Sequence, residues 1–417
     1  MNVLIVGGGG REHAIAWKLR QSPRVGKLYC APGNAGIAEI AEIVPIKAND
    51  LAGLVDFARH NPIDLVFVAP DDPLALGLVD ELEAAGIRAF GPRRQAAVIE
   101  ASKAFAKDLM HRHQIPTADY RVFDNQEEAI DWLSTANMPI VVKANGLALG
   151  KGVVIARTRE QAVEAVQEMM SGQAFGTAGK TVVIEQFLTG PELTVLAFTD
   201  GTTICPMVTS RDHKRALDGD QGLNTGGMGA VAPGADLTPE DLDDLCRTIF
   251  QPTIDAMRAE GRLFQGVLYF GLMLTPLGAK VIEFNARFGD PEAQAVLPLL
   301  ETDLVDIIDA VIDKKLDQLS INWKKSCSCC IVLASGGYPG SYKTGYPISG
   351  LDKLPTDCLA FHAGTRRESG KVVTSGGRVL GLTLIAPTLE EAIDAAYSAA
   401  ANVSFEHMHY RRDIGRT

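Results

Sequence analysis

The sequence predicts a multidomain protein that combines the α/β and α+β classes and begins with a doubly wound parallel sheet. Three observations predict this. Residues 1–100 alternate short apolar strands with helices, which is the pattern of a parallel sheet covered on both faces. The length of 417 residues exceeds what one hydrophobic core usually holds. With 46% hydrophobic residues and 41 glycines, the composition is that of a glycine-rich globular protein and not of a disordered chain.

We expect the N-terminal domain to span residues 1–101. Its predicted strands are MNVLIVGG, KLYCAP, DLVFVAP and IRAFGP, and its predicted helices are REHAIAWKLRQS, LAGLVDFARHN and DPLALGLVDELEAAG. In a doubly wound sheet, the ligand crevice lies at the carboxyl ends of the strands. The segments GGGGREH and APDDP occupy that position, so we expect a ligand there.

A second domain is expected over residues 102–323 and a third over 324–417. The second begins with SKAFAKDLMHRHQIP, a capped helix closed by a proline. A small α/β pattern follows and ends at VVIEQFLTG, which predicts a lid subdomain at about residues 119–187. The chain from Pro191 to about Trp323 has a larger mixed pattern. The last domain is predicted to be small, mixed α/β and rich in glycine-containing turns.

Charge, hydropathy and cysteine usage exclude several classes of protein. The net charge of -11 argues against non-specific nucleic-acid binding, because no basic face can dominate. No apolar run reaches the roughly 18 residues of a membrane-spanning helix, and MNVLIVGGGG begins a strand instead of a signal peptide. Seven cysteines suit reduced thiols, and the cluster KSCSCC fits a strand better than a zinc site. We therefore expect a cytoplasmic protein without nucleic-acid or membrane partners.

The segment GGGGREH follows a strand and opens a helix, so its free backbone N–H groups predict an anion site. Gly9, Gly10 and Arg11 are the residues expected to hold a phosphate. A dinucleotide fold is disfavoured, because Glu12 stands where the last glycine of G-x-G-x-x-G belongs and KLYCAP ends without the acidic residue that holds a ribose. A tight turn with a surface arginine is the structural alternative.

The segment MPIVVKANGLALGKGVVIA predicts two strands joined by a glycine-rich turn that lies over phosphates. Lys143 lies inside the first strand and Lys151 at the end of the turn. A lysine among apolar residues is costly to bury unless it meets an anion. Alternatively, Lys143 could reach solvent from an edge strand. The segment is not a Walker A loop, because neither Ser nor Thr follows the lysine and a strand replaces the helix.

The segment TVVIEQFLTGPELTV predicts a strand, a short connector and another strand. Glu185, the backbone through Leu188, and Glu192 could recognise an adenine edge and a ribose diol. This pattern alone is a weak signal, because exposed glutamates are common.

The segment SRDHKRALDGDQGLNTGGMGAVAP is predicted to be a functional loop, because it is too charged to pack and too rich in glycine for a helix. Asp212, His213, Lys214 and Arg215 are expected to contact phosphates and an amino acid. A merely solvated loop is the alternative.

The segment VIEFNARFGDPE predicts a strand followed by a helix. Glu283, Asn285 and Arg287 alternate along the chain, so their side chains point to one side of the strand. The first two offer hard oxygens that suit Mg²⁺, and Arg287 can grip a carboxylate with two donors. A helix beginning near Asp290 and Pro291 would add N–H groups. A buried ion pair between strand and helix is the structural alternative.

Together these segments resemble the ATP-grasp ligases, and within them most closely the family of phosphoribosylamine-glycine ligases of purine biosynthesis. The resemblance covers nearly the whole chain. It rests on GGGGREHA at 7–14, SKAFAKDLM at 102–110, DHKRALDGDQGLNTGGMGA at 212–230, RFGDPEAQAV at 287–296 and YRRDIG at 410–415. It implies an ATP-grasp unit with a mobile lid between two outer domains, the first of which binds phosphoribosylamine.

The resemblance implies an enzyme that uses ATP and Mg²⁺ or Mn²⁺ to join glycine to 5-phosphoribosylamine through a glycyl phosphate. The implied metal ligands are Glu283 and Asn285. The residues implied to approach ATP are Lys103, Lys143, Lys151, Glu185, Leu188 and Glu192. Implied catalytic residues are Asp212 for the glycine ammonium, Arg287 for its carboxylate, and Lys214. The implied substrate-binding residues are Gly9, Gly10, Arg11, Pro70, Asp212, Asn224, Thr225, Gly226, Arg287, Gly289 and Asp290.

The sequence departs from the family pattern at two places. Pro-Asp-Asp-Pro at residues 70–73 replaces Pro-Glu-Ala-Pro, and Gly-Leu-Asn-Thr at residues 222–225 replaces Gly-Pro-Asn-Thr. Acidic side chains would repel the phosphate of a phosphosugar. Asp71 and Asp72 are therefore expected to face the ribose hydroxyls or solvent.

Three other functions stay open at this point. An ATP-grasp enzyme that uses bicarbonate or formate would leave Asp212 without an ammonium partner. A non-catalytic nucleotide-binding regulator would bind ATP without consuming it. An oxidoreductase is disfavoured by the missing dinucleotide fingerprint. For the ligase, we expect a monomer that makes a transient contact with the enzyme supplying phosphoribosylamine.

Overall fold

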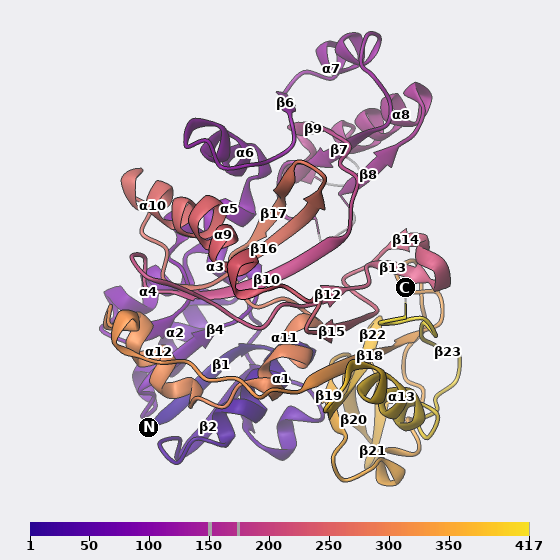
Figure 1. The fold of residues 1–417 in the computed structure, drawn as a ribbon. Helices are drawn as coiled ribbons and strands as arrows, with labels where there is room; N and C mark the ends of the chain where they lie inside the picture. The colour runs from indigo at the N-terminus through magenta and orange to yellow at the C-terminus, as the bar shows by residue number, and fades with distance from the viewer. Residues whose placement is uncertain (149–151, 173–175, 417) are drawn as a thin grey trace.

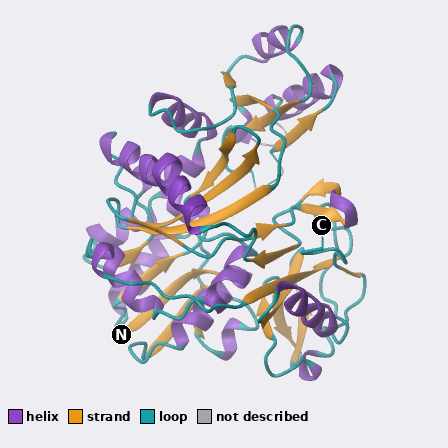
Figure 2. Ribbon diagram, in the orientation of Figure 1, coloured by secondary structure: helices purple, strands orange, loops and turns teal. Residues whose placement is uncertain are grey.

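The computed structural model describes residues 1–148, 152–172 and 176–416. Figure 1 shows the chain as a body built around three larger sheets, with another four-stranded sheet and its helices projecting from one end. Helices and strands are mixed in every part of the molecule (Figure 2). In the described part of the chain, no helix is long and apolar enough to cross a membrane.

The N-terminal part forms the predicted parallel sheet, with the strand order β3-β2-β1-β4-β5. Its strands are β1 (Asn2–Gly7), β2 (Lys27–Pro32), β3 (Glu42–Ile43), β4 (Leu65–Val68) and β5 (Ala89–Phe90). Its helices are α1 (Gly10–Arg20), α2 (Leu51–His60), α3 (Asp71–Leu76), α4 (Leu78–Ala84) and α5 (Arg94–Ala101). As predicted, the glycine turn follows the carboxyl end of β1, and Pro70 follows that of β4.

One predicted helix of this sheet is wrong. The segment DPLALGLVDELEAAG forms two helices, α3 and α4, instead of one. Gly77 separates them with a φ of 97°, a left-handed conformation that only glycine adopts at low cost. The apolar periodicity continues from α3 into α4, so the sequence pattern alone did not reveal that the helix is interrupted at Gly77.

The projecting sheet has the order β6-β9-β7-β8 and consists of antiparallel pairs. Its strands are β6 (Tyr120–Phe123), β7 (Ile140–Ala144), β8 (Val153–Ala156) and β9 (Val182–Gln186), and its helices are α7 (Gln126–Leu133) and α8 (Arg159–Met170). These elements share a separate apolar core, which includes Leu133, Val142 and Val166. The elements therefore form a compact unit that projects from the body (Figure 1).

The central sheet has the order β11-β10-β16-β17. Its strands are β10 (Glu192–Thr199), β11 (Ile204–Pro206), β16 (Gly266–Thr275) and β17 (Gly278–Asn285). The helices of this part are α6 (Lys103–Arg112), α9 (Pro239–Leu245), α10 (Gln251–Ala259), α11 (Glu292–Val296) and α12 (Leu304–Ile312). Two apolar clusters contain residues of both this sheet and the N-terminal sheet, so the two sheets share their core.

The last sheet runs in the order β12-β15-β18-β22-β19, and β23 also pairs with β18. Its strands are β12 (Arg211–Asp212), β15 (Gly229–Ala232), β18 (Cys327–Ser335), β19 (Leu359–His362), β22 (Arg378–Ala386) and β23 (Met408–His409). Helix α13 (Leu389–Ala400) packs on it, and the hairpins β13 (Arg215–Leu217) with β14 (Gln221–Asn224) and β20 (Thr365–Glu368) with β21 (Lys371–Thr374) lie beside it. Strands β12 and β15 precede residue 324, so this sheet joins segments that the predicted domains separate.

The cysteine cluster forms strand β18, as predicted, and all seven cysteines are free thiols. Residues 211–232 differ from the predicted loop, because they form four short strands and a turn. The reason is a distant partner: β15 pairs antiparallel with β18, with Ala230 opposite Cys330.

Candidate active site

The face of strand β17 that carries Glu283 and Asn285 is bordered by two cations. Lys214 Nζ donates to Glu283 Oε1 at 3.1 Å, and Arg287 Nη2 donates to Asn285 Oδ1 at 3.3 Å. The Lys214 ammonium lowers the pKa of Glu283 to about 2, although burial opposes this. The Glu283 carboxylate is therefore ionised at neutral pH and keeps its character as a hard oxygen ligand.

Arg287 is held by two acidic groups, of which the sequence indicated Asp71 but not Glu100. Its Nη2 lies 2.8 Å from Glu100 Oε1 and 3.8 Å from Asp71 Oδ2. Glu100 also accepts the backbone N–H of Ala286 at 2.7 Å. The Nε of Arg287 is buried without a hydrogen-bond partner, so one donor stays available for a ligand carboxylate. This ion pair matches the structural alternative in part, but its acid comes from α5.

Of the two expectations for Asp71, the one that it faces solvent is wrong, and the one that it faces the ribose hydroxyls stays a prediction. Its side chain is only 23% exposed and lies near Arg287 instead of facing solvent. Burial raises the pKa of Asp71, but Arg287 and Arg11 together lower it below its usual value. Asp72 accepts a long hydrogen bond from Asn49 at the surface. The two acidic residues that replace Glu-Ala therefore differ in their contacts. Asp71 lies near the positive charges of Arg287 and Arg11, whereas Asp72 contacts Asn49 at the surface.

The predicted ATP-side residues meet where the projecting sheet joins the body. Lys143, in β7, lies 2.9 Å from Glu185 Oε1 and donates to the Ile282 carbonyl at 3.0 Å. Lys107, in α6, lies 2.8 Å from Glu185 Oε2. Glu185 therefore lies between two lysines on an interior strand of the projecting sheet, and its contact with adenine or ribose stays a prediction.

The other ATP-side residues lie around this pair. Lys103 begins α6 and donates from Nζ to the Gly146 carbonyl at 3.0 Å. Leu188 lies in the connector after β9, and Glu192 begins β10 with a carboxylate oxygen 3.8 Å from Lys214 Nζ. The prediction for Lys151 lies outside the described residues.

Asp212 lies in a buried cluster of acidic and hydroxyl groups. Its Oδ1 is buried and has no hydrogen-bond partner. Burial and then the neighbouring Glu292 raise the pKa of Asp212, and burial also raises the pKa of Glu292. Tyr269 belongs to the same cluster and is hydrogen-bonded to Thr194 at 3.0 Å. An unpaired carboxyl of this kind can accept an ammonium group from a ligand.

His213 is held within the local fold, and its expected contact with a ligand stays a prediction. It is buried, and its Nε2 accepts the N–H of Gly415 at 3.1 Å. Burial and two nearby arginines lower the pKa of His213 to about 4. Arg215 donates to the Gly222 carbonyl within its own hairpin. Both residues therefore hold the local fold, and of the four residues 212–215 it is Asp212 and Lys214 that reach the site.

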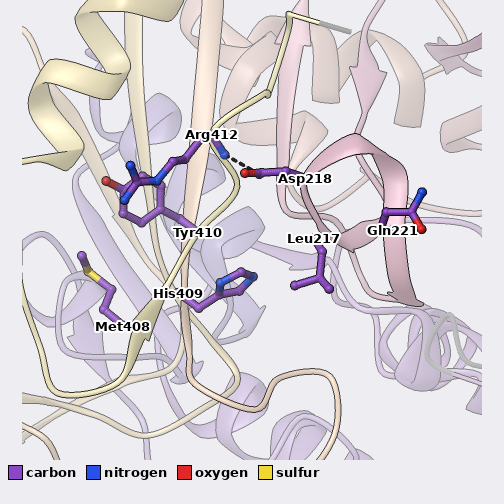
Figure 3. A pocket seen from close by; sticks show the side chains of 7 residues that line it. All are labelled: Leu217, Asp218, Gln221, Met408, His409, Tyr410 and Arg412. Atoms are coloured by element: carbon purple, nitrogen blue, oxygen red, sulfur yellow. Dashed lines mark hydrogen bonds between the residues drawn. The ribbon is translucent and has the colours of Figure 1, made fainter.

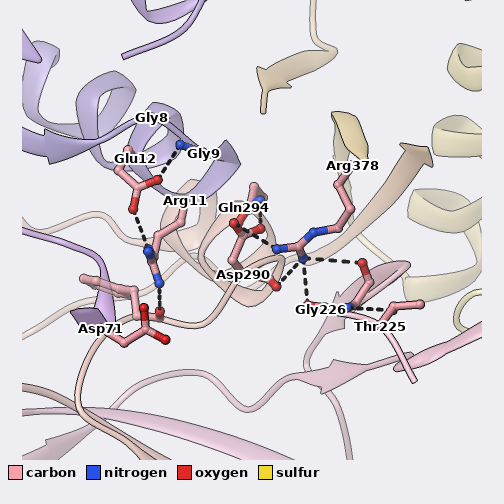
Figure 4. Close-up of polar contacts among 12 residues, drawn as sticks. Gly8, Gly9, Arg11, Glu12, Asp71, Thr225, Gly226, Asp290, Gln294 and Arg378 are labelled. Carbon is pink, nitrogen blue, oxygen red and sulfur yellow. Dashed lines mark hydrogen bonds and ion pairs between the residues drawn. The ribbon is translucent and has the colours of Figure 1, made fainter. Parts of the chain in front are cut away.

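The glycine turn before α1 is only partly free to bind an anion. The N–H of Gly9 donates to Glu12 Oε2 at 2.6 Å, so the prediction of free N–H groups is wrong for this residue. Arg11 pairs with Glu12 at 2.7 Å and donates to the Phe288 carbonyl at 3.2 Å. Figure 4 shows the contacts among Gly9, Arg11 and Glu12, and the turn lies beside Asp290. Arg11 is therefore a buried link between two loops and not a surface arm.

The remaining predicted substrate residues lie on two loops that touch. Asn224 ends β14, and the Thr225 hydroxyl donates to the Lys214 carbonyl at 2.8 Å. Gly226 contacts Arg378 (Figure 4). Gly289 precedes Asp290, and a Cβ at Gly289 would lie 2.3 Å from Glu292 Oε2, so a larger residue there would require the Glu292 side chain to move.

Sequence reasoning missed five residues of this site: Glu100, Lys107, Tyr269, Glu292 and Arg378. Lys107 could have been found, because it lies four residues after Lys103 on the same helix face. Arg378 gave no local signal, since it comes from a strand far along the chain.

A surface cavity of about 530 Å³ lies away from this site, between hairpin β13–β14 and residues 408–412. Figure 3 shows Leu217, His409 and Tyr410 around it. None of the predicted site residues in the described part of the chain lines this cavity. This cavity is therefore not part of the candidate active site.

The residues around Glu283 fit a divalent cation bound together with a nucleotide. Glu283 and Asn285 supply two hard oxygens on one strand face. No group of three or more His, Cys, Asp or Glu side chains in the described part of the chain could hold a metal alone. Phosphates and water would complete the coordination, which is the usual arrangement for Mg²⁺.

Comparison with known structures first defines the class. The biotin carboxylase domain of Hydrogenobacter thermophilus 2-oxoglutarate carboxylase shares 17% identity and a TM-score of 0.75, covering 98% of this chain and 91% of that chain. This likeness shows a common fold. The ATP-grasp (A) domain of phosphoribosylglycinamide synthetase matches residues 101–293, so the chain has the fold of an ATP-grasp protein.

Matches to the outer domains and to full-length relatives then define the family within this class. The N domain of phosphoribosylglycinamide synthetase matches residues 1–100 and its C domain matches residues 328–417. A phosphoribosylamine–glycine ligase of Halalkalibacterium halodurans is 50% identical over 100% of this chain and 96% of its own length. The structure of the Thermotoga maritima ligase is 33% identical, with a TM-score of 0.88 over 99% of this chain and 100% of that chain. The chain belongs to the phosphoribosylglycinamide synthetase family.

Proposed function

We propose that this protein is an ATP-dependent carbon–nitrogen ligase that joins glycine to 5-phosphoribosylamine. The products are glycinamide ribonucleotide, ADP and phosphate, which makes the reaction a step of de novo purine biosynthesis. Membership of the family and full-length similarity to phosphoribosylamine–glycine ligases support this function.

One observation distinguishes glycine from other acids. Beside the β17 face, Arg287 offers an unpaired buried donor, and Asp212 offers an unpaired buried acceptor. Glycine carries a carboxylate for the first and an ammonium for the second. Bicarbonate and formate have no ammonium, so neither would satisfy Asp212.

On the ATP side, Lys103, Lys143 and Lys151 would neutralise the phosphates, and Glu185, Leu188 and Glu192 would surround adenine and ribose. The position of Lys143 supports this role. Its buried ammonium donates to the carbonyl of Ile282 in β17, the residue next to the proposed metal ligand Glu283. Glu283 and Asn285 would hold Mg²⁺, or Mn²⁺ in its place. When bound, the ion supplies positive charge that stabilises the phosphoryl oxygens.

The phosphosugar would lie against the turn before α1. Gly10 and Arg11 would meet its phosphate, and Pro70, Asn224, Thr225, Gly226, Gly289 and Asp290 would line the remainder of the substrate site. Gly9 would join them only if its N–H exchanged Glu12 for the ligand.

The chemistry follows from these groups. A glycine carboxylate oxygen attacks the γ-phosphorus of ATP, the bond to the β-γ bridging oxygen breaks, and glycyl phosphate and ADP form. The amine of phosphoribosylamine then attacks the acyl carbon, and phosphate leaves with the carbon–oxygen bonding pair while the nitrogen loses a proton. Arg287 and Asp212 orient glycine in both steps, and Lys214 keeps Glu283 ionised. No covalent bond to the protein is needed.

Glycyl phosphate hydrolyses in open water, so the site must be closed before amide formation. Residues of about 119–187 would serve as the lid. The separate apolar core of the projecting sheet supports this role, because a compact unit can move as a body.

The function is tested by measuring ADP and phosphate release from Mg-ATP, with glycine and freshly generated 5-phosphoribosylamine added separately and together. We expect release only with both, together with a mass that matches the amide. Consumption of ATP with another acid would agree with the ATP-grasp fold but contradict glycine as the substrate. Binding of ATP without consumption would favour a regulator.

We further propose that the protein is a cytoplasmic monomer that receives phosphoribosylamine by transient contact with the enzyme that forms it. Its seven free thiols are compatible with a reducing compartment. Light scattering at assay concentration would give the mass of one chain, and a dimer mass would contradict the proposal.

A further inference from the structure

Arg378, the first residue of β22, connects the C-terminal sheet to both substrate loops. Its Nη1 donates to the Gly226 carbonyl at 2.7 Å and also to the Asp290 carbonyl. Its Nη2 lies 3.3 Å from Asp290 Oδ2. The side chain is 21% exposed, so these contacts are largely shielded from water (Figure 4). One guanidinium therefore fixes the positions of the two loops relative to each other.

Tyr338, which also belongs to the C-terminal part of the chain, forms a second hydrogen bond with Gly226. The N–H of Gly226 donates to the Tyr338 hydroxyl at 3.0 Å, while its carbonyl accepts from Arg378. A Cβ on the next residue, Gly227, would lie 2.6 Å from Asp212 Oδ1. The turn held by Arg378 and Tyr338 therefore packs directly against the carboxyl proposed for glycine.

Asp290 lies on the opposite side of Arg378, against the turn before α1. A Cβ added to Gly9 would lie 3.3 Å from Asp290 Oδ2, and Gln294 donates to Asp290 Oδ1 at 2.7 Å. Burial opposes the charge of Asp290, but Arg378 and Arg11 together lower its pKa. Removal of the Arg378 guanidinium would leave this carboxylate and the carbonyls of Gly226, Gly227 and Asp290 short of partners, which favours separation of the loops.

We propose that Arg378 is a positioning residue that aligns the phosphoribosylamine amine with the glycyl group. This inference rests on the proposed ligase function and adds a specific task for the C-terminal sheet. The hydrogen bonds of Arg378 within the described residues go to Gly226, Gly227 and Asp290, and not to α6, β7 or β9. Loss of Arg378 should therefore impair the use of the sugar amine and leave ATP binding intact.

The chemical consequence is uncoupling of ATP consumption from amide formation. In the coupled reaction, the amine nitrogen forms the bond to the acyl carbon and phosphate leaves. When the amine is displaced, a water oxygen attacks the same carbon, and glycine and phosphate are regenerated. ATP is then consumed without an amide product, so the ratio of ADP to amide rises above one.

The test compares Arg378→Lys with the native protein at saturating glycine. We expect the KM for 5-phosphoribosylamine to rise about tenfold, which is the change in binding expected when one charged hydrogen bond is lost. The ratio of ADP to amide should exceed one, and the KM for ATP should stay unchanged. The matched control is Arg367→Lys, because Arg367 also joins the C-terminal part to the N-terminal part, through Glu39 at 2.8 Å, but contacts neither loop.

Tyr338→Phe tests the same turn if Arg378→Lys does not fold. This variant removes only the acceptor of the Gly226 N–H, and it should shift both readouts in the same direction by a smaller factor. A native KM for the amine and one ADP per amide in a folded Arg378→Lys would overturn the inference. Absence of ADP release by the native protein would instead remove the proposed function, so the two failures are distinguishable.

Discussion

At the scale of single residues, the site is organised by charge pairs that exist before any ligand binds. The partly buried Arg287 guanidinium is held by Glu100, and Lys214 is held by Glu283. Burial penalises each isolated charge, but partners within hydrogen-bond distance offset that penalty. The unpaired Arg287 Nε and Asp212 Oδ1 are the groups left over for a ligand.

This pairing determines which Arg287 variant is informative. Arg287→Ala would leave Glu100 as an unpaired buried carboxylate and cost about 3–5 kcal/mol of stability. Arg287→Lys keeps the charge and loses the planar fork, so we expect the KM for glycine to rise by about tenfold or more with little unfolding. Glycine saturation curves check this, and unchanged saturation would contradict the role of Arg287. Arg88→Lys is the control, because Arg88 pairs with Asp309 and Asp313 outside the site.

At the scale of elements, the start of α6 is fastened to the turn that follows β7. Asn145 Oδ1 accepts the N–H of Ala104 at 2.8 Å and the Ser102 hydroxyl at 3.1 Å. The Asn145 carbonyl accepts the N–H of Lys103 at 3.0 Å. These contacts place the first lysine of α6 beside the glycine-rich turn, so both should act on ATP together.

Asn145→Ala should therefore raise the KM for ATP several-fold, since its amide oxygen holds two donors. Asn125→Ala provides a matched control. Asn125 caps α7 by accepting two N–H groups, from Glu127 and Glu128, but it lies at the surface away from the predicted ATP residues. Its loss should cost about 1 kcal/mol of stability and leave the KM for ATP unchanged. Equal effects of the two variants on the KM would contradict a specific role for Asn145.

Elements with a local signal were predictable from the sequence, and elements defined by distant partners were not. The parallel sheet, the Ser102 cap of α6 and the strand of the cysteine cluster follow from periodicity, capping residues and apolar runs. Strand β15 exists because β18, nearly one hundred residues later, pairs with it. For the same reason the sequence predicted the polar residues of the β17 face and missed Glu100 and Arg378, which arrive from α5 and β22.

At the scale of the whole molecule, the N-terminal and C-terminal parts meet through a pair of neutral histidines. The N–H of His362, in β19, donates to His13 Nδ1, in α1, at 2.8 Å. Both rings are buried, and His362 also shares a hydrogen bond with Thr365 at 3.0 Å. Burial and then the neighbouring His362 lower the pKa of His13 to about 3, because a charged ring is poorly solvated in this interface.

This arrangement predicts loss of stability in mild acid. The unfolded chain binds a proton at His13 below its ordinary pKa of 6.5, whereas the folded chain does so only near pH 3. Between these values the unfolded state binds more protons, so stability falls as the pH falls, by about 2 kcal/mol from this histidine at pH 5. Urea unfolding at pH 7 and pH 5 should show that His13→Gln reduces the loss by this amount. A similar change in the exposed control His60→Gln, or none in His13→Gln, would show that the interface is not the origin.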